Sequence, residues 1–359
     1  MSRLIALMVA LAAAAPPLTG QSVQGRVLTQ TSDEPLGGAL VLLLDNSGAE
    51  VARAVTTPSG GFALRAPTPG TYQVVVRQIG LQAWKSPAFS LMVGTDYPLT
   101  LRIEPRPYEL PPITVAGRRS RCDVALDDED LIGRLLDAAR TALGIAEASA
   151  EAGAYGFATD GYLKRLSTEF AVVESTSTDL LFLTTWPIQS ADPDSLQRWG
   201  FVRGMVTQPE GPTYYGPDAR VLFSDWFLDS HCFEVEAGDD TLVEIRFEPE
   251  RRDDRVDLEG RLVIDRASLE LRRMTFEYIG LPRWVPRDVA GGEVELRRLR
   301  QGAWVPTTWY LRAPLPSRSR WTSKVMLRGW METGGRVTAV HTAKGVLDST
   351  LTAELLTSP

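Results

Sequence analysis

The chain has 359 residues, of which 44% are hydrophobic and 23% charged, and its formal net charge is −7. These values are ordinary for a folded protein, and the length allows two domains that each bury a hydrophobic core. Acidic and basic residues are mixed along the chain, so there is no basic stripe of the kind that binds nucleic acid, and we exclude that class of function.

The first 20 residues have the pattern of a secretory signal peptide. Arg3 supplies a charged start, and residues 4–15 form an alanine-rich apolar stretch that is too short to span a membrane. Pro16, Pro17 and Gly20 end this stretch, and we prefer cleavage after Gly20. We therefore expect an exported protein, located in the periplasm or associated with the outer membrane. No later stretch reaches membrane-spanning length, so we expect no transmembrane span in the mature chain.

Residues 21–104 alternate short apolar runs with turns rich in glycine and proline. The alternation is clearest at residues 62–64 and 72–76, which flank a Pro/Gly turn. Strands at this spacing predict a small, seven-stranded antiparallel β-sandwich. The seven candidates are residues 23–27, Leu40–Leu44, 51–55, 62–64, 72–76, 88–93 and 99–103.

Three motifs in this region resemble those of a known domain. They are GRV…PLGGAxV at residues 25–41, TxPSGGFAL at 56–64 and PGTYxVxVxxIG at 69–80. The region is similar to the carboxypeptidase regulatory-like domain, a prealbumin-like (transthyretin-like) sandwich found beside zinc carboxypeptidases and at the front of many TonB-dependent receptors. The resemblance implies this fold without catalytic residues. The label "carbohydrate-binding-like", sometimes given to the fold class, is an analogy of shape.

Residues 105–121 contain four prolines and predict a stiff, extended linker. Within it, Leu110, Ile113 and Val115 resemble the short segment that follows such modules in TonB-dependent receptors, where it can pair with a periplasmic partner as an added strand. The alternative is a plain linker that ends in a strand of the next domain.

Residues 122–359 predict an α+β domain in which one long helix packs on a curved antiparallel sheet. Residues 123–150 begin with acidic residues and continue with apolar residues at helical spacing, and a short helical turn is expected around residues 195–199. The strand candidates are residues 155–165, 169–177, 220–224, 231–236, 241–249, 258–265, 270–279, 293–299, 303–312, 323–332 and 336–346.

Residues 260–278 predict a hairpin with its turn at 265–268 and a bulge at Arg272 and Arg273. This hairpin is similar to the repeating unit of the curved, half-barrel sheets in lipoprotein-carrier-like periplasmic domains. The back half as a whole resembles the uncharacterised C-terminal halves of exported bacterial proteins that carry the same front module. That resemblance implies an architecture without an assigned reaction.

The chain has two cysteines, Cys122 and Cys232. In an oxidising compartment such a pair predicts a disulfide, which closes a loop of about 110 residues. The alternative is two buried free thiols.

Two sets of residues could carry chemistry. His231 and Glu234, with the distant His341, follow the order of ligands in zinc carboxypeptidases, but residues 231 and 234 of one strand point to opposite faces. Carboxylates near Trp226, at Asp225, Asp229 and Glu234, could serve glycoside hydrolysis, although loop capping is the simpler interpretation. We therefore predict no catalytic residues, no metal and no cofactor.

The nine tryptophans gather mostly in the back half. Aromatic rings along a concave sheet could stack on sugars or cover an acyl chain, or they could fill the space between helix and sheet. Trp304, Trp309, Trp321 and Trp330 are the candidates for a ligand-facing cluster. We predict a non-enzymatic binding or scaffolding protein of the cell envelope, with a glycan, a lipid or an envelope protein such as a TonB-type outer-membrane system as its partner. A zinc carboxypeptidase is the remaining alternative.

Overall fold

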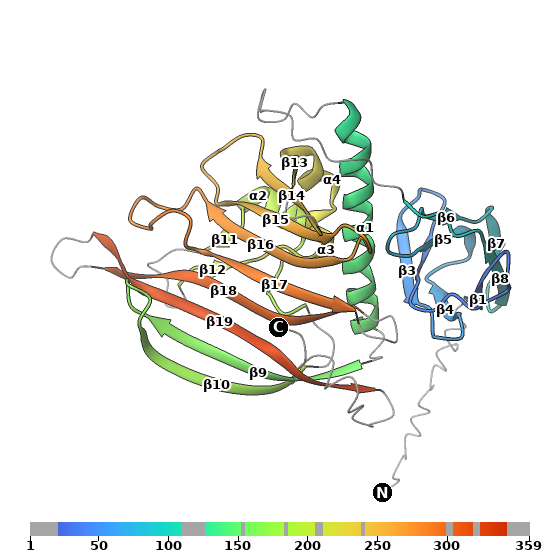
Figure 1. Cartoon of the computed structure of the whole chain (residues 1–359), viewed down its shortest axis with the longest axis horizontal. Helices are drawn as coiled ribbons and strands as arrows, with labels where there is room; N and C mark the ends of the chain where they lie inside the picture. Colours follow the sequence, from blue (N-terminus) through green and yellow to red (C-terminus); the bar gives the residue numbers. More distant parts are fainter. Residues whose placement is uncertain are drawn as a thin grey trace, which may run out of the picture.

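The protein is described here by a computed structural model, which covers residues 21–108, 126–151, 155–182, 186–204, 211–237, 241–298, 304–318 and 324–342. The chain forms a small β-sandwich, one long helix beside it, and a large twisted sheet on the other side of the helix (Figure 1). The predicted class, mainly β with a sandwich followed by one long helix on an antiparallel sheet, is confirmed.

The sandwich consists of two sheets with the strand orders β4-β1-β8 and β3-β2-β5-β6, and β7 pairs with β5. Phe62, Leu64 and Ala66 of β4 are buried and alternate with exposed neighbours, as the sequence pattern predicts. The hydroxyl of Tyr72 donates a hydrogen bond of 2.6 Å to the carbonyl oxygen of Thr68 and thereby holds the Pro/Gly turn. The strands are β1 (Gln21–Thr29), β2 (Leu40–Leu44), β3 (Glu50–Val55), β4 (Gly61–Ala66), β5 (Gly70–Arg77), β6 (Trp84–Lys85), β7 (Phe89–Leu91) and β8 (Asp96–Ile103).

Two details of the sandwich differ from the prediction. β8 runs parallel to β1, with Ser22 beside Asp96 and Thr29 beside Ile103, so the sandwich is not wholly antiparallel. The chain enters β8 from β7 in the other sheet and not through a hairpin with β1, which leaves its direction free. The strand β6 adds an eighth member, and two residues are too few to show an alternating pattern.

The predicted long helix is α1 (Leu126–Glu151), with 26 residues, and the predicted short one is α2 (Pro193–Trp199). The strand expected at residues 220–224 is wrong, because two short helices, α3 (Ala219–Leu222) and α4 (Asp225–Ser230), occupy this region. The side chain of Asp218 accepts from the amide of Val221, and that of Ser224 accepts from the amide of Phe227. These two N-caps stabilise helical turns, although the apolar pattern of the segment suggested a strand.

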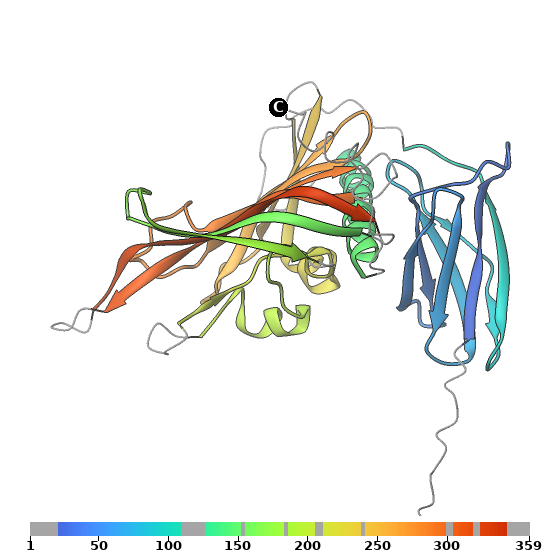
Figure 2. The same cartoon turned by 90° about the horizontal axis from the view of Figure 1, so that it is seen from below.

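The large sheet is antiparallel, with nine strands in the order β10-β9-β19-β18-β17-β16-β15-β14-β13. Its strands are β9 (Tyr155–Leu166), β10 (Val172–Phe182), β13 (His231–Ala237), β14 (Leu242–Pro249), β15 (Asp257–Asp265), β16 (Leu271–Ile279), β17 (Gly291–Arg298), β18 (Trp304–Arg318) and β19 (Val325–Thr342). A separate pair joins β11 (Val202–Arg203) to β12 (Thr213–Tyr214). Seen from below, the short helices lie against one face of this sheet (Figure 2).

The hairpin between β15 and β16 agrees with its sequence. The carboxylate of Asp265 accepts from the amides of Ala267 and Ser268 in the turn. The pairing then passes from Arg273 to Leu271 and omits Arg272, which is the predicted bulge.

The predicted strands 323–332 and 336–346 are a single strand, β19, so the expected break between them is wrong. Gly334 and Gly335 make room for neighbouring strands and do not form a turn. A Cβ atom on Gly334 would lie 2.6 Å from the Trp309 carbonyl oxygen, and one on Gly335 would lie 2.7 Å from the Trp309 ring. The indole of Trp309 therefore lies against Gly335, and the Trp309 backbone lies against Gly334.

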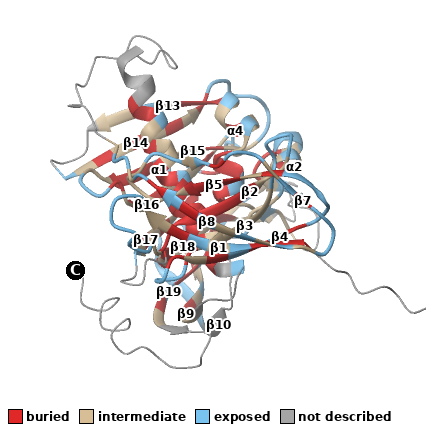
Figure 3. Ribbon diagram, turned by 90° about the vertical axis from the view of Figure 1, so that its right-hand side faces the viewer, coloured by how far each residue is buried: buried red, intermediate tan, exposed pale blue. Residues whose placement is uncertain are grey.

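The core of the back half lies between the sheet and α1. Val243, Ile245 and Phe247 of β14 are fully buried and alternate with partly buried polar residues, so one face of the sheet is apolar. Leu135 and Leu143 of α1 are likewise fully buried in the same cluster. Viewed from the sandwich side, buried segments gather toward the middle of the molecule and exposed ones toward its outline (Figure 3).

Candidate functional site

Helix α1 contacts the sandwich as well as the large sheet. Leu40, Leu42 and Val75, from the outer face of β2 and β5, belong to the same hydrophobic cluster as α1, whereas Val41 and Leu43 face the inside of the sandwich. β2 is thus covered on both faces, which explains its unbroken run of apolar residues. The sandwich and the back half therefore share a packed interface.

Gly144 marks the closest approach between α1 and β2. A Cβ atom at this position would lie 2.8 Å from Cδ2 of Leu40, closer than the packing allows. Glycine inside a helix costs about 1 kcal/mol relative to alanine, so its presence here exchanges helix stability for close packing.

Ion pairs flank this apolar contact. The Arg77 guanidinium pairs with the Asp137 carboxylate, which also accepts a 3.0 Å hydrogen bond from the hydroxyl of Tyr108. Burial and the negative charge of Asp137 raise the pKa of Tyr108 to about 12. On the other side, Nη1 of Arg53 lies 2.7 Å from Oε2 of Glu147. Charged residues of the sandwich are therefore paired with opposite charges on α1.

The Arg77–Asp137 pair is expected to couple the two domains energetically. The two side chains are only 19% and 24% exposed, so we expect a coupling free energy of about 1 kcal/mol from a double-mutant cycle of Arg77→Ala and Asp137→Ala. Urea unfolding of the four proteins measures it. The pair Arg102–Asp33, with side chains 55% and 63% exposed, is the control and should give a value near zero. Equal coupling in both pairs would contradict the expectation.

A cavity of about 390 Å³ opens beside these contacts, and we name it the interdomain cleft. Its wall consists of Leu42, Leu44 and Val75 from the sandwich and of Phe223 from the back half. Its charged lining comes from both halves: Glu50, Arg53, Arg77, Arg140, Glu147 and Arg220. Cavities of this size at domain junctions are common places for small ligands.

Most of the charged groups around the cleft are already paired. Arg220 lies 2.9 Å from the carboxylate of Asp218, and Arg53 pairs with Glu147. Burial, and after it the negative charge of Asp218, raises the pKa of the Glu147 carboxyl, while the Arg53 guanidinium acts in the opposite direction.

Arg140 differs from these arginines. Its guanidinium lies 5.8 Å from the centre of the Phe223 ring, and Nη2 donates one long bond of 3.4 Å to the Phe223 carbonyl oxygen. Within the part of the chain that the structure describes, no carboxylate lies within 4.0 Å of this guanidinium. Arg140 as a residue is exposed and lines the cleft, while burial is the main cause that lowers the pKa of its guanidinium.

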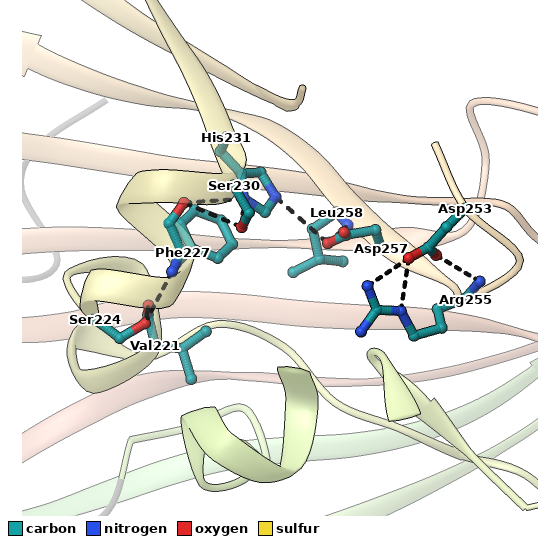
Figure 4. Close-up of polar contacts among 9 residues, drawn as sticks. All are labelled: Val221, Ser224, Phe227, Ser230, His231, Asp253, Arg255, Asp257 and Leu258. Carbon is teal, nitrogen blue, oxygen red and sulfur yellow. Dashed lines mark hydrogen bonds and ion pairs between the residues drawn. The ribbon is translucent and has the colours of Figure 1, made fainter. Parts of the chain in front are cut away.

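His231 is buried at the start of β13, the edge strand of the sheet (Figure 4). Its ring stacks on Phe227 with 3.7 Å between centroids, and Nδ1 lies 3.1 Å from the Phe227 carbonyl oxygen. Nε2 lies 3.4 Å from the carboxylate of Asp257. The histidine thus connects α4 to the sheet.

The structure does not bring the suggested zinc ligands together. His231 is buried and Glu234 is exposed on the other face of β13, as the spacing along a strand predicts. His341 belongs to β19, six strands away in the sheet. Asp225 and Asp229 are both exposed on the short helix α4.

The suggested aromatic cluster is wrong for two of its members. Trp304 and Trp330 are only 1% and 0% exposed and belong to the core, so they do not face an open concave surface. Phe170 stacks on Trp330 at 5.6 Å and helps to cover it. Trp309 is half-buried, and Trp321 lies outside the described residues.

Two further predictions rest partly or wholly on residues outside the described ranges. Cys232 is buried, and the structure has no free cysteine among the residues it describes. Cys122 and the suggested docking residues Leu110, Ile113 and Val115 lie outside them. The disulfide and the docking strand therefore stay predictions.

Glu259 of β15, Glu277 of β16 and Asp288 of the loop before β17 bring three carboxylates within 4.8 Å of one another. Burial, followed by the charges of Asp288 and Glu259, raises the pKa of Glu277. The folded state therefore binds this proton more tightly than the unfolded state. Its stabilising contribution is present below the unfolded-state pKa of about 4.3 and is lost as the pH rises through the higher folded-state pKa.

The variant Glu277→Gln is therefore expected to raise the midpoint of urea unfolding at pH 7 and to change it little at pH 4. The matched control is Glu169→Gln, because hydrogen bonds from Thr168 and Ser167 lower the pKa of Glu169. That control should not gain stability at pH 7. A lower midpoint for Glu277→Gln at pH 7 would show that burial and repulsion of the ionised carboxylate do not destabilise the folded state.

Sequence reasoning missed the arginines and glutamates of the interdomain cleft. No local pattern distinguishes these arginines and glutamates from other charged residues. Their partners are distant in the sequence, as Arg53 and Glu147 are, which lie 94 residues apart. Two signals pointed to the interface: the unbroken apolar run of Leu40–Leu44, and Gly144 within a helix.

None of the described helices combines the length and the apolar character that crossing a membrane requires. No curated protein sequence is significantly similar to the chain.

Solved structures with partial similarity differ strongly in sequence. The 5-hydroxyisourate hydrolase of Klebsiella pneumoniae shares 18% identity over 24% of this chain and 86% of its own, with a TM-score of 0.20. A protein of Bacteroides uniformis described as carbohydrate-binding shares 11% identity over 73% of this chain and 99% of its own, with a TM-score of 0.22. These scores are too low to support an argument about function.

Residues 22–104 match the family model of the carboxypeptidase regulatory-like domain. This range coincides with the described sandwich and with the motifs that suggested the resemblance. The front module of the chain is therefore a carboxypeptidase regulatory-like domain.

Proposed function

We propose that this chain is an exported, non-enzymatic binding protein of the cell envelope that holds a small polar ligand in the interdomain cleft. Export is supported by the charged start and the apolar stretch within residues 1–20. The front domain is of a kind that carries no catalytic residues, and the suggested zinc ligands of the back half lie apart.

The observation that carries this proposal is the cavity of about 390 Å³ between the two domains. Its lining combines apolar side chains with charged groups, which suits a sugar, an organic acid or a similar polar molecule better than an acyl chain. A periplasmic or outer-membrane location gives such a protein access to small molecules that enter the envelope. The alternative of a TonB-type partner depends on residues outside the described ranges.

Occlusion of the cleft tests the proposal. Leu44→Trp places a larger side chain in the cavity wall, and Leu281→Trp, in the back half and outside this wall, is the matched control. Thermal unfolding and calorimetry with monosaccharides, uronic acids, amino acids and phosphate should reveal a ligand for the native protein and the control. Binding that is unchanged in Leu44→Trp would place the site elsewhere. If none of these probes binds the native protein, the proposal is contradicted.

A further inference from the structure

We infer that the interdomain cleft is selective for an anionic ligand, whose carboxylate or phosphate group is bound by the guanidinium of Arg140. This inference rests on the proposed function and adds the chemical class of the ligand. It starts from Arg140, the arginine of the cleft for which the described residues provide no carboxylate within 4.0 Å.

The pairing around the cleft leaves Arg140 as the available cation. Arg53, Arg77 and Arg220 each contact a carboxylate of Glu147, Asp137 or Asp218. Arg140 has only the 3.4 Å bond to the carbonyl oxygen of Phe223 among the described residues. A guanidinium has five N–H donors, so most of them have no acceptor among the residues that the structure describes.

The geometry also orients this group. The ring of Phe223 lies 5.8 Å from the guanidinium carbon, so one side of Arg140 is supported by an aromatic face. The planar fork of arginine matches the two oxygens of a carboxylate or phosphate and can bind them with two parallel hydrogen bonds. Arg77 lines the same cavity and adds positive charge, although Asp137 compensates it in part.

The other residues that line the cleft indicate what kind of molecule carries the anionic group. Leu42 and Leu44 add apolar surface to the lining, and Glu50 and Glu147 offer acceptors for hydroxyl donors. An anionic group on a small hydroxylated body, such as a uronic acid or a sugar phosphate, has both features. A cavity of about 390 Å³ accommodates a molecule of this size.

Glucuronate and glucose are the matched probes, because they differ only in the carboxylate. Inorganic phosphate tests whether the anion alone is sufficient. We expect glucuronate, phosphate or both to bind the native full-length protein at millimolar concentration, as measured by calorimetry, and glucose to bind more weakly than glucuronate. Loss of charge-assisted hydrogen bonds should make the affinity of Arg140→Gln about 10–100-fold weaker.

Two controls make the result specific. Arg65→Gln removes one exposed arginine from β4, away from the cleft lining, and should bind as the native protein does. Phosphate also stabilises folded proteins by exclusion from their surface, so the informative quantity is the difference between the native protein and Arg140→Gln. Arg140→Lys keeps the charge but loses the fork and should have intermediate affinity.

The outcomes separate this inference from the proposed function. Equal affinity for glucose and glucuronate, or unchanged affinity of Arg140→Gln for the anions, would overturn the anionic class while leaving a ligand in the cleft. Failure of both anions to bind at millimolar concentration would also overturn it. If none of the monosaccharides, uronic acids and amino acids binds either, the proposed function is also contradicted.

Discussion

Replacement of Cys122 or Cys232 by alanine is expected to lower the free energy of unfolding by about 4–5 kcal/mol, because the predicted disulfide closes a loop of about 110 residues. Cys232 is buried on β13, at the edge of the large sheet, and Cys122 precedes α1 in the sequence. The bridge would therefore tie the segment before the helix to the edge strand β13. Guanidinium unfolding of oxidised protein, exported by its host, measures the loss.

The double variant supplies the control for this prediction. If the two sulfurs form one bond, Cys122→Ala and Cys232→Ala should have similar effects, and the double variant should be no less stable than either. Reductant should destabilise the native protein by a similar amount and leave the variants unchanged. Alkylation of two free thiols in the intact exported protein, detected by mass spectrometry, would show that the disulfide does not exist.

Replacement of Phe227 by alanine is expected to cost about 3–5 kcal/mol, the second large effect. This ring is 0% exposed, stacks on His231 at 3.7 Å and meets Phe247 edge-on at 5.6 Å. Removing it leaves a cavity between α4 and the sheet, and His231 loses the ring on which it stacks (Figure 4). Urea unfolding followed by tryptophan fluorescence measures the change.

A smaller loss for Phe227→Leu would support a packing role, because leucine refills part of the cavity. Phe170→Ala is the matched control, since this phenylalanine is 43% exposed and its removal should cost much less. If Phe227→Ala and Phe170→Ala were equally destabilising, α4 would contribute little to the stability of the sheet edge.

The strands and the long helix could be predicted because their patterns are local. The alternation in β14, or the helical spacing in α1, reports which face of one element is buried. The direction of β8 could not be predicted in this way, since a strand has the same alternation whether its neighbour is parallel or antiparallel. The apolar run at residues 220–224 was ambiguous for another reason: its capping residues, and not its periodicity, decide in favour of helix.

The interdomain cleft lay beyond prediction because its groups come from distant segments. Arg77 and Asp137 are 60 residues apart, and although the apolar run of β2 indicates that both of its faces are covered, no local pattern shows that α1 covers the outer one. For the tryptophans, the sequence suggested a site that the described part of the structure does not have. Their number suggested a ligand surface, but Trp304 and Trp330 are core residues, and composition alone does not separate these two roles.

The position of β19 in the sheet has a consequence for how the protein folds. Among the described strands, β9 and β10 join the rest of the sheet only through β19, and the hydroxyl of Thr338 donates to the carbonyl oxygen of Ala158, 180 residues earlier. Closing so long a loop costs entropy before any contact rewards it, so this step should be slow. During synthesis, which proceeds from the N-terminus, β9 and β10 cannot join the rest of the sheet until residues 325–342 have been made. Until then the β9–β10 hairpin has unpaired edges, so a holding chaperone would protect this protein most during that interval.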